Sequence, residues 1–102
     1  MIIQWTEPAI QDLESIKNYI SKDSEHYAII FLEKIFLSLE NLISFPEIGR
    51  RVPEAEKENI REIIYSNYRI IYKLEENRIL ILAIIHGSRN LLQMEPKPWE
   101  II

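Results

Sequence analysis

The stretch RILILAIIH, from Arg78 to His86, restricts the possible folds of this chain more than any other segment. Residues 79–85 are all apolar, so a strand formed here would be apolar on both of its faces. Such a strand has to be covered on both sides, as a central strand of a sheet is. Strict alternation would place Ile79, Ile81, Ala83 and Ile85 on one face, and Leu80, Leu82 and Ile84 on the other.

Two more segments with strand character precede this one, Ile60–Tyr65 and Tyr68–Leu74. Ser66-Asn67 separates them, and Glu75-Glu76-Asn77 leads into the strand at 78–86. Short connections made of turn-forming residues join antiparallel neighbours. The sequence therefore predicts a three-stranded antiparallel meander over residues 60–86.

The N-terminal half has a different pattern. Residues 2–5, IIQW, indicate a short first strand. Thr6-Glu7-Pro8 is a helix start, with a hydroxyl cap, an acid near the positive end of the helix dipole and a proline in the first turn. We expect this helix to end near Ser21 and a second helix to be capped by Asp23 or Ser24. The short link between them predicts an antiparallel helical hairpin.

The second helix is unusually apolar. One stripe at helical spacing is sufficient to face a core, and here it consists of Ala28, Phe31, Leu32, Ile35, Leu39 and Leu42. Five further residues widen the apolar surface well beyond one face: Ile29, Ile30, Phe36, Leu37 and Ile43. A helix of this kind is either buried on two sides or exposes a surface for a partner.

Proline and glycine mark the remaining segments. Pro46, Gly49 and Pro53 predict a loop over residues 46–59, and Pro96 and Pro98 predict an extended tail over 89–102. Within this tail, Trp99, Ile101 and Ile102 would tuck against the body or cover a groove.

The elements together predict an α+β fold. An N-terminal strand and an antiparallel helical hairpin would pack on one side of a mainly antiparallel sheet that ends in the meander. A length of 102 residues predicts one domain, 1–102.

The composition excludes several kinds of site. Cysteine is absent, which excludes disulfides, thiol catalysis and cysteine-bound zinc. The two histidines have no partners at metal-ligand spacing, and two distant glycines cannot form a phosphate-binding loop. We therefore expect no metal and no cofactor. The first residues do not resemble a signal peptide, and charges interrupt every long apolar run, so we expect a cytoplasmic protein with no membrane contact.

The charges are distributed unevenly. Residues 1–49 carry three lysines against eight acids, whereas residues 50–90 carry eight basic residues, six of them arginines, against six acids. Arginine suits bidentate contacts to carboxylates and phosphates. One interpretation is a partner-binding surface in the second half, and the other is an ordinary solvated surface.

Three segments together carry a family resemblance: WTEPAIQDLESIKNYI at 5–20, FPEIGRRV at 45–52 and IREIIYSNYRIIYKLEENRILILAIIHGSRN at 60–90. They resemble the RelE/ParE superfamily of toxins from bacterial toxin–antitoxin modules, over nearly the whole chain. In this superfamily, RelE-like members cut mRNA in the ribosomal A site and ParE-like members poison DNA gyrase. The resemblance implies a cognate antitoxin as partner, and the function of a plasmid-stabilisation toxin.

The resemblance also assigns residues. RelE members use basic residues on the first and second meander strands, an arginine after the last strand and a later tyrosine. Arg69 and Arg89 match the second and third of these positions, and Arg61 keeps one basic residue on the first strand. Next to Arg61, the family has a second basic residue where this chain has Glu62. No tyrosine follows Tyr72. The proton-transfer groups of an endoribonuclease are therefore mostly missing.

The stretch ILILAIIHGSRN is closer to the ParE pattern, so we expect a toxin that inhibits gyrase by binding, without catalysis. One alternative is a ribosome-dependent endoribonuclease acting on mRNA, with Arg69, Arg89, Arg61 and His86 as catalytic residues. Another is an inert relative that only binds an antitoxin.

The candidate partner-binding residues are Arg89, His86, Arg69, Arg50, Arg51, Ile29, Phe36 and Ile43. The arginines also have structural interpretations. Arg69 would pair with a glutamate of the sheet, Arg89 would cap the strand end, and Arg50 and Arg51 would only make the loop soluble. Gly87 would let the backbone turn and present Arg89 beyond the sheet.

Overall fold

The computed structural model describes residues 1–100 and has an α+β fold. Its elements, in chain order, are β1 (Ile2–Trp5), α1 (Glu7–Ser21), α2 (Glu25–Ser44), β2 (Arg50–Arg51), β3 (Ile60–Tyr65), β4 (Tyr68–Leu74), β5 (Arg78–His86) and the 3-10 helices η1 (Leu91–Gln93) and η2 (Pro98–Glu100). The five strands form one sheet in the order β1-β5-β4-β3-β2. Only the pairing of β1 with β5 is parallel, because the helical hairpin connects β1 to the rest of the sheet.

The two helices begin where the hydroxyl caps predicted. The Thr6 hydroxyl accepts the backbone N–H of Ala9, 3.3 Å away, and also donates to the carbonyl of Ile81, which ties the start of α1 to β5. At α2 the cap is Ser24, whose hydroxyl accepts the N–H of Tyr27 over 3.2 Å. These caps satisfy backbone donors that a helix start leaves without partners.

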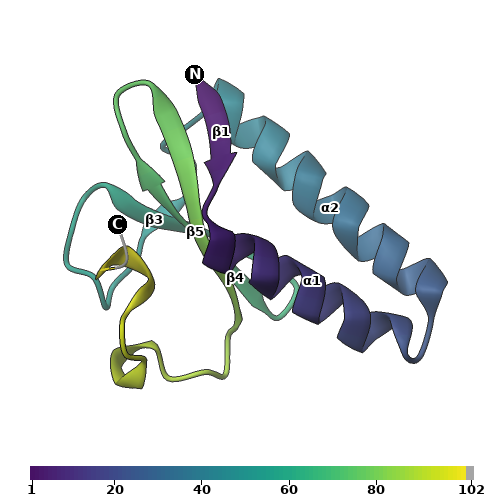
Figure 1. Cartoon of the computed structure of the whole chain (residues 1–102). Coiled ribbons are helices and arrows are strands. Elements are labelled where there is room, and N and C mark those ends of the chain that lie inside the picture. Colours follow the sequence, from purple (N-terminus) through teal and green to yellow (C-terminus); the bar gives the residue numbers. More distant parts are fainter. Residues whose placement is uncertain (101–102) are drawn as a thin grey trace.

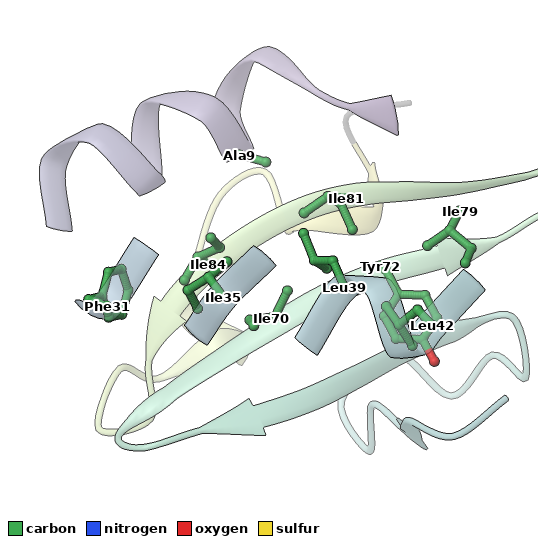
Figure 2. Packing of buried hydrophobic residues seen from close by; sticks show 10 residues of the cluster. All are labelled: Ala9, Phe31, Ile35, Leu39, Leu42, Ile70, Tyr72, Ile79, Ile81 and Ile84. Carbon is green, nitrogen blue, oxygen red and sulfur yellow. The ribbon is translucent and has the colours of Figure 1, made fainter. Parts of the chain in front are cut away.

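The two helices cover one face of the sheet, and the C-terminal segment lies on the other side (Figure 1). The sheet thereby separates two apolar clusters. The helix-side cluster lies under α1 and α2, and Figure 2 shows its members: Ala9, Phe31, Ile35, Leu39, Leu42, Ile70, Tyr72, Ile79, Ile81 and Ile84. The opposite face is covered by the loop after β2 and by the C-terminal segment, with Val52, Ala55, Leu91 and Trp99 packed on the sheet. The prediction that β5 is a central strand is confirmed, since β5 lies between β1 and β4.

The alternation expected along β5 is interrupted by a bulge. Ile71 pairs with Ala83, but the next residue, Tyr72, pairs with Ile81, so Leu82 is an extra residue in β5. Beyond the bulge the faces are exchanged: Ile84 joins the helix-side cluster and Ile85 the opposite one. The faces that strict alternation gave to Ile84 and Ile85 were therefore wrong, because a single inserted residue reverses a period of two.

Two further expectations need correction. The predicted loop 46–59 contains a strand, β2, whose two residues pair with β3. The predicted extended tail contains the two 3-10 turns η1 and η2. Trp99 does tuck against the body, with only 9% of its surface exposed, whereas Ile101 and Ile102 lie outside the described residues.

Candidate functional site

The sheet face opposite the helices holds a buried ionic cluster made of Arg50, Glu54, Glu62 and Arg69. Arg69 and Glu62 come from neighbouring strands, β4 and β3, and Glu54 comes from the loop that covers them. The Nε of Arg69 donates to Glu62 Oε1 at 2.5 Å, and its two terminal nitrogens donate to the two oxygens of Glu54 at 2.9 and 2.8 Å. The planar guanidinium thus makes a two-pronged contact with one carboxylate and a third bond with the other.

Glu62 is the centre of this cluster. Its side chain has no exposed surface, and its second oxygen accepts the Nε of Arg50 at 2.7 Å. Burial of a charge is costly unless the charge is paired and hydrogen-bonded, and both oxygens of Glu62 are. Because two guanidinium groups meet two carboxylates, the cluster carries no net charge.

The pKa values reflect this pairing. The hydrogen bond from Arg69 holds the pKa of Glu54 below its usual range. The hydrogen bond to Glu54, with that to Glu62 beside it, raises the pKa of Arg69. Both partners therefore stay ionised at neutral pH, and the positive charge of Arg69 is neutralised within the protein.

A surface pocket of about 590 Å³ adjoins the cluster. Its lining includes Arg50, Glu54 and Arg69, together with the β3–β4 turn and the residues His86 to Ser88 at the end of β5. Only 10% of the Arg69 side chain is exposed, while 62% of the Arg50 side chain is. Arg50 is therefore open to solvent in this pocket, whereas Glu54 and Glu62 take up the hydrogen-bond donors of Arg69. This agrees with the structural interpretation of Arg69 and shows that Arg50 does more than solubilise a loop.

Arg51 and Arg61 have different surroundings. Arg51 is exposed and lies 3.7 Å from Glu58, which is more exposed still, so this pair contributes little to stability. Arg61 donates to the carbonyl oxygens of Gly49, at 2.8 Å, and Glu47, at 3.5 Å. Its register partner on β4 is Tyr72, a member of the helix-side cluster, so Arg61 points away from the ionic cluster.

His86 lies on the helix side of the sheet, because the bulge reverses the alternation before it. It pairs in register with Tyr68, and the two rings meet edge to face with their centroids 5.5 Å apart. The Nδ1 of His86 accepts the backbone N–H of Ser88 at 3.1 Å and lies 2.7 Å from the Ser88 hydroxyl. The sequence HGSR thus forms a turn, closed by the N–H of Arg89 donating to the carbonyl of His86.

Arg89 projects from the end of this turn and is exposed. It lines a smaller pocket, about 290 Å³, together with Asp12, Tyr19, Tyr68 and His86. Neither Gly87 nor the other glycine has a positive φ, so the turn before Arg89 does not use the left-handed conformation available to glycine. The chain nevertheless turns there, as expected, and leaves the guanidinium beyond the end of β5.

Asp12 of α1 is a site residue that no sequence signal revealed. Its carboxylate accepts the backbone N–H of Ile84 at 3.0 Å, at a point of β5 where β1 has already ended. Burial raises the pKa of Asp12, while the bond from Ile84 and the nearby positive charge of Arg89 act in the opposite direction. Asp12 therefore joins the first helix to the strand that carries Arg89.

The structure does not bring the four candidate catalytic residues together. Arg69 lies on one face of the sheet within a neutral cluster, and Arg61 lies on the other, bound to carbonyl groups. His86 shares the 290 Å³ pocket beside α1 with Arg89, and it also lines the 590 Å³ pocket together with Arg69. The two acids that bind Arg69 are Glu54, 15 residues away in sequence, and Glu62, 7 residues away. Only Glu62 was singled out from the sequence, as an acid at a position where the family has a basic residue.

The apolar candidates lie on α2. Ile29 is 55% exposed, and Phe36 and Ile43 are each 48% exposed. They belong to the side of the helix that does not face the core, where Ile35, Leu39 and Leu42 are fully buried or nearly so. The second helix is thus covered on one side only and leaves an apolar surface open.

Within residues 1–100, no group of three or more histidine, aspartate or glutamate side chains is arranged to hold a metal ion. In the same part of the chain, no helix has the length and apolar character needed to cross a membrane.

Comparison with known proteins agrees with this architecture. A family model described as the ParE toxin of the type II toxin–antitoxin system parDE matches residues 3–91. Among curated protein sequences, no significant match to the chain was found.

Solved structures with this fold include the chromosomal ParDE toxin–antitoxin system from P. aeruginosa, with a TM-score of 0.69 and 21% identity over 86% of this chain and 97% of that one. The toxin–antitoxin complex RelBE2 from Mycobacterium tuberculosis is also similar, with a TM-score of 0.56 and 16% identity over 83% of this chain and 95% of that one. The resemblance noted in the sequence is confirmed, and the family model favours the ParE branch. Because the match extends from the first strand to the turn after β5, the chain belongs to the ParE toxin family of type II toxin–antitoxin systems.

Proposed function

We propose that this toxin stops growth by binding and inhibiting DNA gyrase, and that it has no nuclease activity of its own. The observation that carries this proposal is the pairing of the charged Arg69 with two carboxylates in a cluster that has no net charge. Cleavage of RNA by the neighbouring 2′-hydroxyl needs cations that face the developing phosphorane charge and a base that takes the hydroxyl proton. Here Glu54 and Glu62 already occupy Arg69, the residue at the family's second-strand position.

The position of the other candidates supports the same proposal. A phosphate that approached Arg69 would meet the carboxylate of Glu54 first, since 24% of that side chain is exposed against 10% of Arg69. Two like charges at such a distance repel each other. His86 borders the same pocket as Arg69, but its ring packs edge to face on Tyr68 and its Nδ1 accepts the backbone N–H of Ser88.

We propose Arg89 as the central residue of the target-binding surface, with His86 beside it. Arg89 is the exposed arginine of the 290 Å³ pocket, and the side chains of Tyr19, Tyr68 and His86 lie around it. Arginine and tyrosine next to one another are typical of residues that contribute most to binding in protein interfaces. The pocket lies at one end of the sheet, where a large protein partner has free access.

The solved relatives of this fold are described as toxin–antitoxin systems or complexes, which supports a cognate antitoxin as the second partner of this chain. We propose that the antitoxin covers the open side of α2, because three large apolar side chains, Ile29, Phe36 and Ile43, are each about half exposed there.

Two assays run side by side test the function. The purified chain should block DNA supercoiling by gyrase and should leave mRNA intact on translating ribosomes. Codon-phased cleavage of mRNA with normal supercoiling would assign the chain to the ribonuclease alternative. Normal results in both assays, from a chain that still binds an antitoxin, would identify an inert relative.

A further inference from the structure

Arg89 is the only one of the six arginines whose side chain has no partner among residues 1–100. Glutamate side chains or carbonyl oxygens bind the guanidinium groups of the other five: Arg50, Arg51, Arg61, Arg69 and Arg78. Arg89 forms a hydrogen bond only through its backbone N–H, to the carbonyl of His86. The donors of its guanidinium are therefore free to bind a group that this part of the chain does not supply.

The pocket of about 290 Å³ around Arg89 combines aromatic and apolar side chains with free hydroxyl groups. Tyr19 and Tyr68 line it, and Ile84 adds apolar surface. Within residues 1–100, Tyr72 is the tyrosine whose hydroxyl forms hydrogen bonds, so the hydroxyls of Tyr19 and Tyr68 remain available as donors.

His86 adds another donor to the lining of this pocket. Its Nδ1 accepts the backbone N–H of Ser88 at 3.1 Å, so the neutral ring carries its hydrogen on Nε2. The edge-to-face contact with Tyr68 restricts the orientation of the ring. A pocket whose polar groups are mainly donors is complementary to a ligand that only accepts hydrogen bonds.

Asp12 is the only acid among the residues that line the pocket, and it does not take up the donors of Arg89. Its carboxylate accepts the backbone N–H of Ile84 at 3.0 Å, and none of the ion pairs among residues 1–100 joins it to Arg89. Burial raises the pKa of Asp12, and the charge of Arg89 acts against this effect from a distance. The guanidinium thus has an acid nearby but no acid in contact.

A protein that covered this pocket would remove water from Arg89. A guanidinium that loses its water without gaining an opposite charge in contact is strongly destabilising. A carboxylate can accept two parallel N–H bonds from the guanidinium, and their attraction increases as water leaves. We propose that this pocket binds a carboxylate group of the target protein, with Arg89 as its bidentate partner. This inference rests on the proposed role of Arg89 in target binding.

The size and charge of the pocket restrict the ligand further. Sites that enclose drug-sized ligands have volumes of roughly 300–1,000 Å³, so this smaller pocket fits one side chain or a chain end. A phosphate monoester carries a charge of about −1.5 to −2 at neutral pH, and Asp12 would repel it more strongly than a carboxylate with a single charge. Asp12 is therefore a specificity-determining residue that favours carboxylates over phosphates.

The test uses four blocked amino acids as probes, added to the full chain. Three carry an acetyl and a methylamide group and are derived from glutamate, glutamine and phosphoserine, and the fourth is N-acetylalanine with a free carboxylate. NMR titration follows the backbone N–H signals of residues 87–90. We expect the glutamate probe to bind roughly tenfold or more tightly than the glutamine probe, because hydrogen bonds to an ionised acceptor are about twice as strong.

The two remaining probes identify the source of the anion. Binding of either carboxylate probe supports the inference, and the tighter of the two shows whether the pocket takes an acidic side chain or a chain end. The phosphoserine probe should bind more weakly than the glutamate probe. Tighter binding of phosphoserine than of glutamate would instead indicate a phosphate site, such as one for nucleic acid, and would overturn the inference.

Variants assign the binding to the named residues. Arg89→Ala should abolish binding of the glutamate probe and Arg89→Lys should recover little of it, since an ammonium group cannot form the bidentate contact. The matched control is Arg51→Ala, because Arg51 is also an exposed arginine but lies on β2. Equal losses in Arg89→Ala and Arg51→Ala would overturn the inference.

Asp12→Asn tests the specificity, because an amide oxygen can still accept the N–H of Ile84 while the charge is removed. It should reduce the difference between the phosphoserine and glutamate probes severalfold. Glu14→Gln is the control, since Glu14 is an exposed acid on the same helix and does not line the pocket. An unchanged ratio of affinities in Asp12→Asn would overturn the role of Asp12.

Equal binding of the glutamate and glutamine probes by the native chain would also overturn the inference. The NMR spectrum of each variant shows whether it is folded. None of these measurements involves gyrase or ribosomes, so a failure here concerns the ligand of the pocket. A failure of the proposed inhibition appears separately, in the two activity assays.

Discussion

The Nε of Arg69 on β4 donates to Glu62 on the neighbouring strand β3 at 2.5 Å. This contact neutralises the charge of Arg69 within the sheet face opposite the helices. Arg69 is the arginine that a ribonuclease of this superfamily would need, and here Glu62 binds it. Arg69 also binds Glu54, which connects the loop after β2 to the sheet. The same contact makes the fold sensitive to changes at either partner, because Glu62 is fully buried.

The first prediction concerns this pair. Arg69→Ala should lower the free energy of unfolding by about 3 kcal/mol, since it leaves Glu62 with only the exposed Arg50 as partner. The melting temperature should fall by roughly 10 °C or more. Arg69→Met combined with Glu62→Leu should recover most of the loss, because the replacement removes both charges together. Urea unfolding measures both, with Arg51→Ala as the exposed control. A stable Arg69→Ala variant would show that the cluster does not hold the fold.

The second prediction concerns pH. The folded protein holds the pKa of Glu54 below its unfolded value, so the stabilisation by this group is present above the unfolded pKa of about 4.3. It is lost as the pH falls from there through the lower folded pKa. The free energy of unfolding, measured between neutral and strongly acidic pH, should therefore decrease less on acidification in Glu54→Gln than in the native chain.

The control for the pH experiment is Glu58→Gln, because the side chain of Glu58 is 88% exposed and its pair with Arg51 is long. This variant should follow the native pH profile. If Glu54→Gln and Glu58→Gln gave the same profile, the bond between Glu54 and Arg69 would contribute nothing measurable to stability.

The third prediction concerns Arg89. Arg89→Ala should abolish growth inhibition, because Arg89 is the proposed central residue of the target-binding surface. It should leave the melting temperature nearly unchanged, because this side chain is exposed. Arg89→Lys should recover little, since an ammonium group cannot make the bidentate contact of a guanidinium. Plating efficiency after induction and thermal unfolding of the purified variants measure the two effects. An alanine variant that is stable and fully toxic would exclude Arg89 from the target-binding surface.

The fourth prediction concerns the two glycines. A Cβ at Gly49 would lie 2.5 Å from the hydroxyl oxygen of Tyr72 and 2.6 Å from the carbonyl oxygen of Glu62. The Tyr72 hydroxyl accepts the N–H of Gly49 and donates to the carbonyl of Pro46, so it has little freedom to move. Gly49→Ala should destabilise the protein by about 2 kcal/mol or more through this overlap.

Gly87→Ala is the matched control for that substitution. Its nearest neighbour would be the carbonyl oxygen of Asn67 at 3.3 Å, and neither glycine has a positive φ, so backbone strain does not differ between them. Chemical denaturation should show a loss for Gly87→Ala well below that for Gly49→Ala. Similar losses of stability in the two variants would mean that the chain around Gly49 can shift to accommodate a Cβ atom.

Local sequence determined most of the elements of this protein. The seven apolar residues at 79–85 require cover on both faces, and β5 is accordingly a central strand between two clusters. The hydroxyls of Thr6 and Ser24 cap the helices where the sequence predicted, because a cap acts within three residues of itself. The excess of apolar residues on α2 also predicted its open side.

The tertiary structure decided what the sequence pattern could not. The bulge at Leu82 depends on the register between β4 and β5, and it places His86 beside Tyr68. The partners of Arg69 and Asp12 come from other elements, and β2 is a strand only because β3 lies beside it. Periodicity and caps are properties of neighbouring residues in the chain, whereas register, ion pairing and the faces of a bulged strand arise only when distant segments meet.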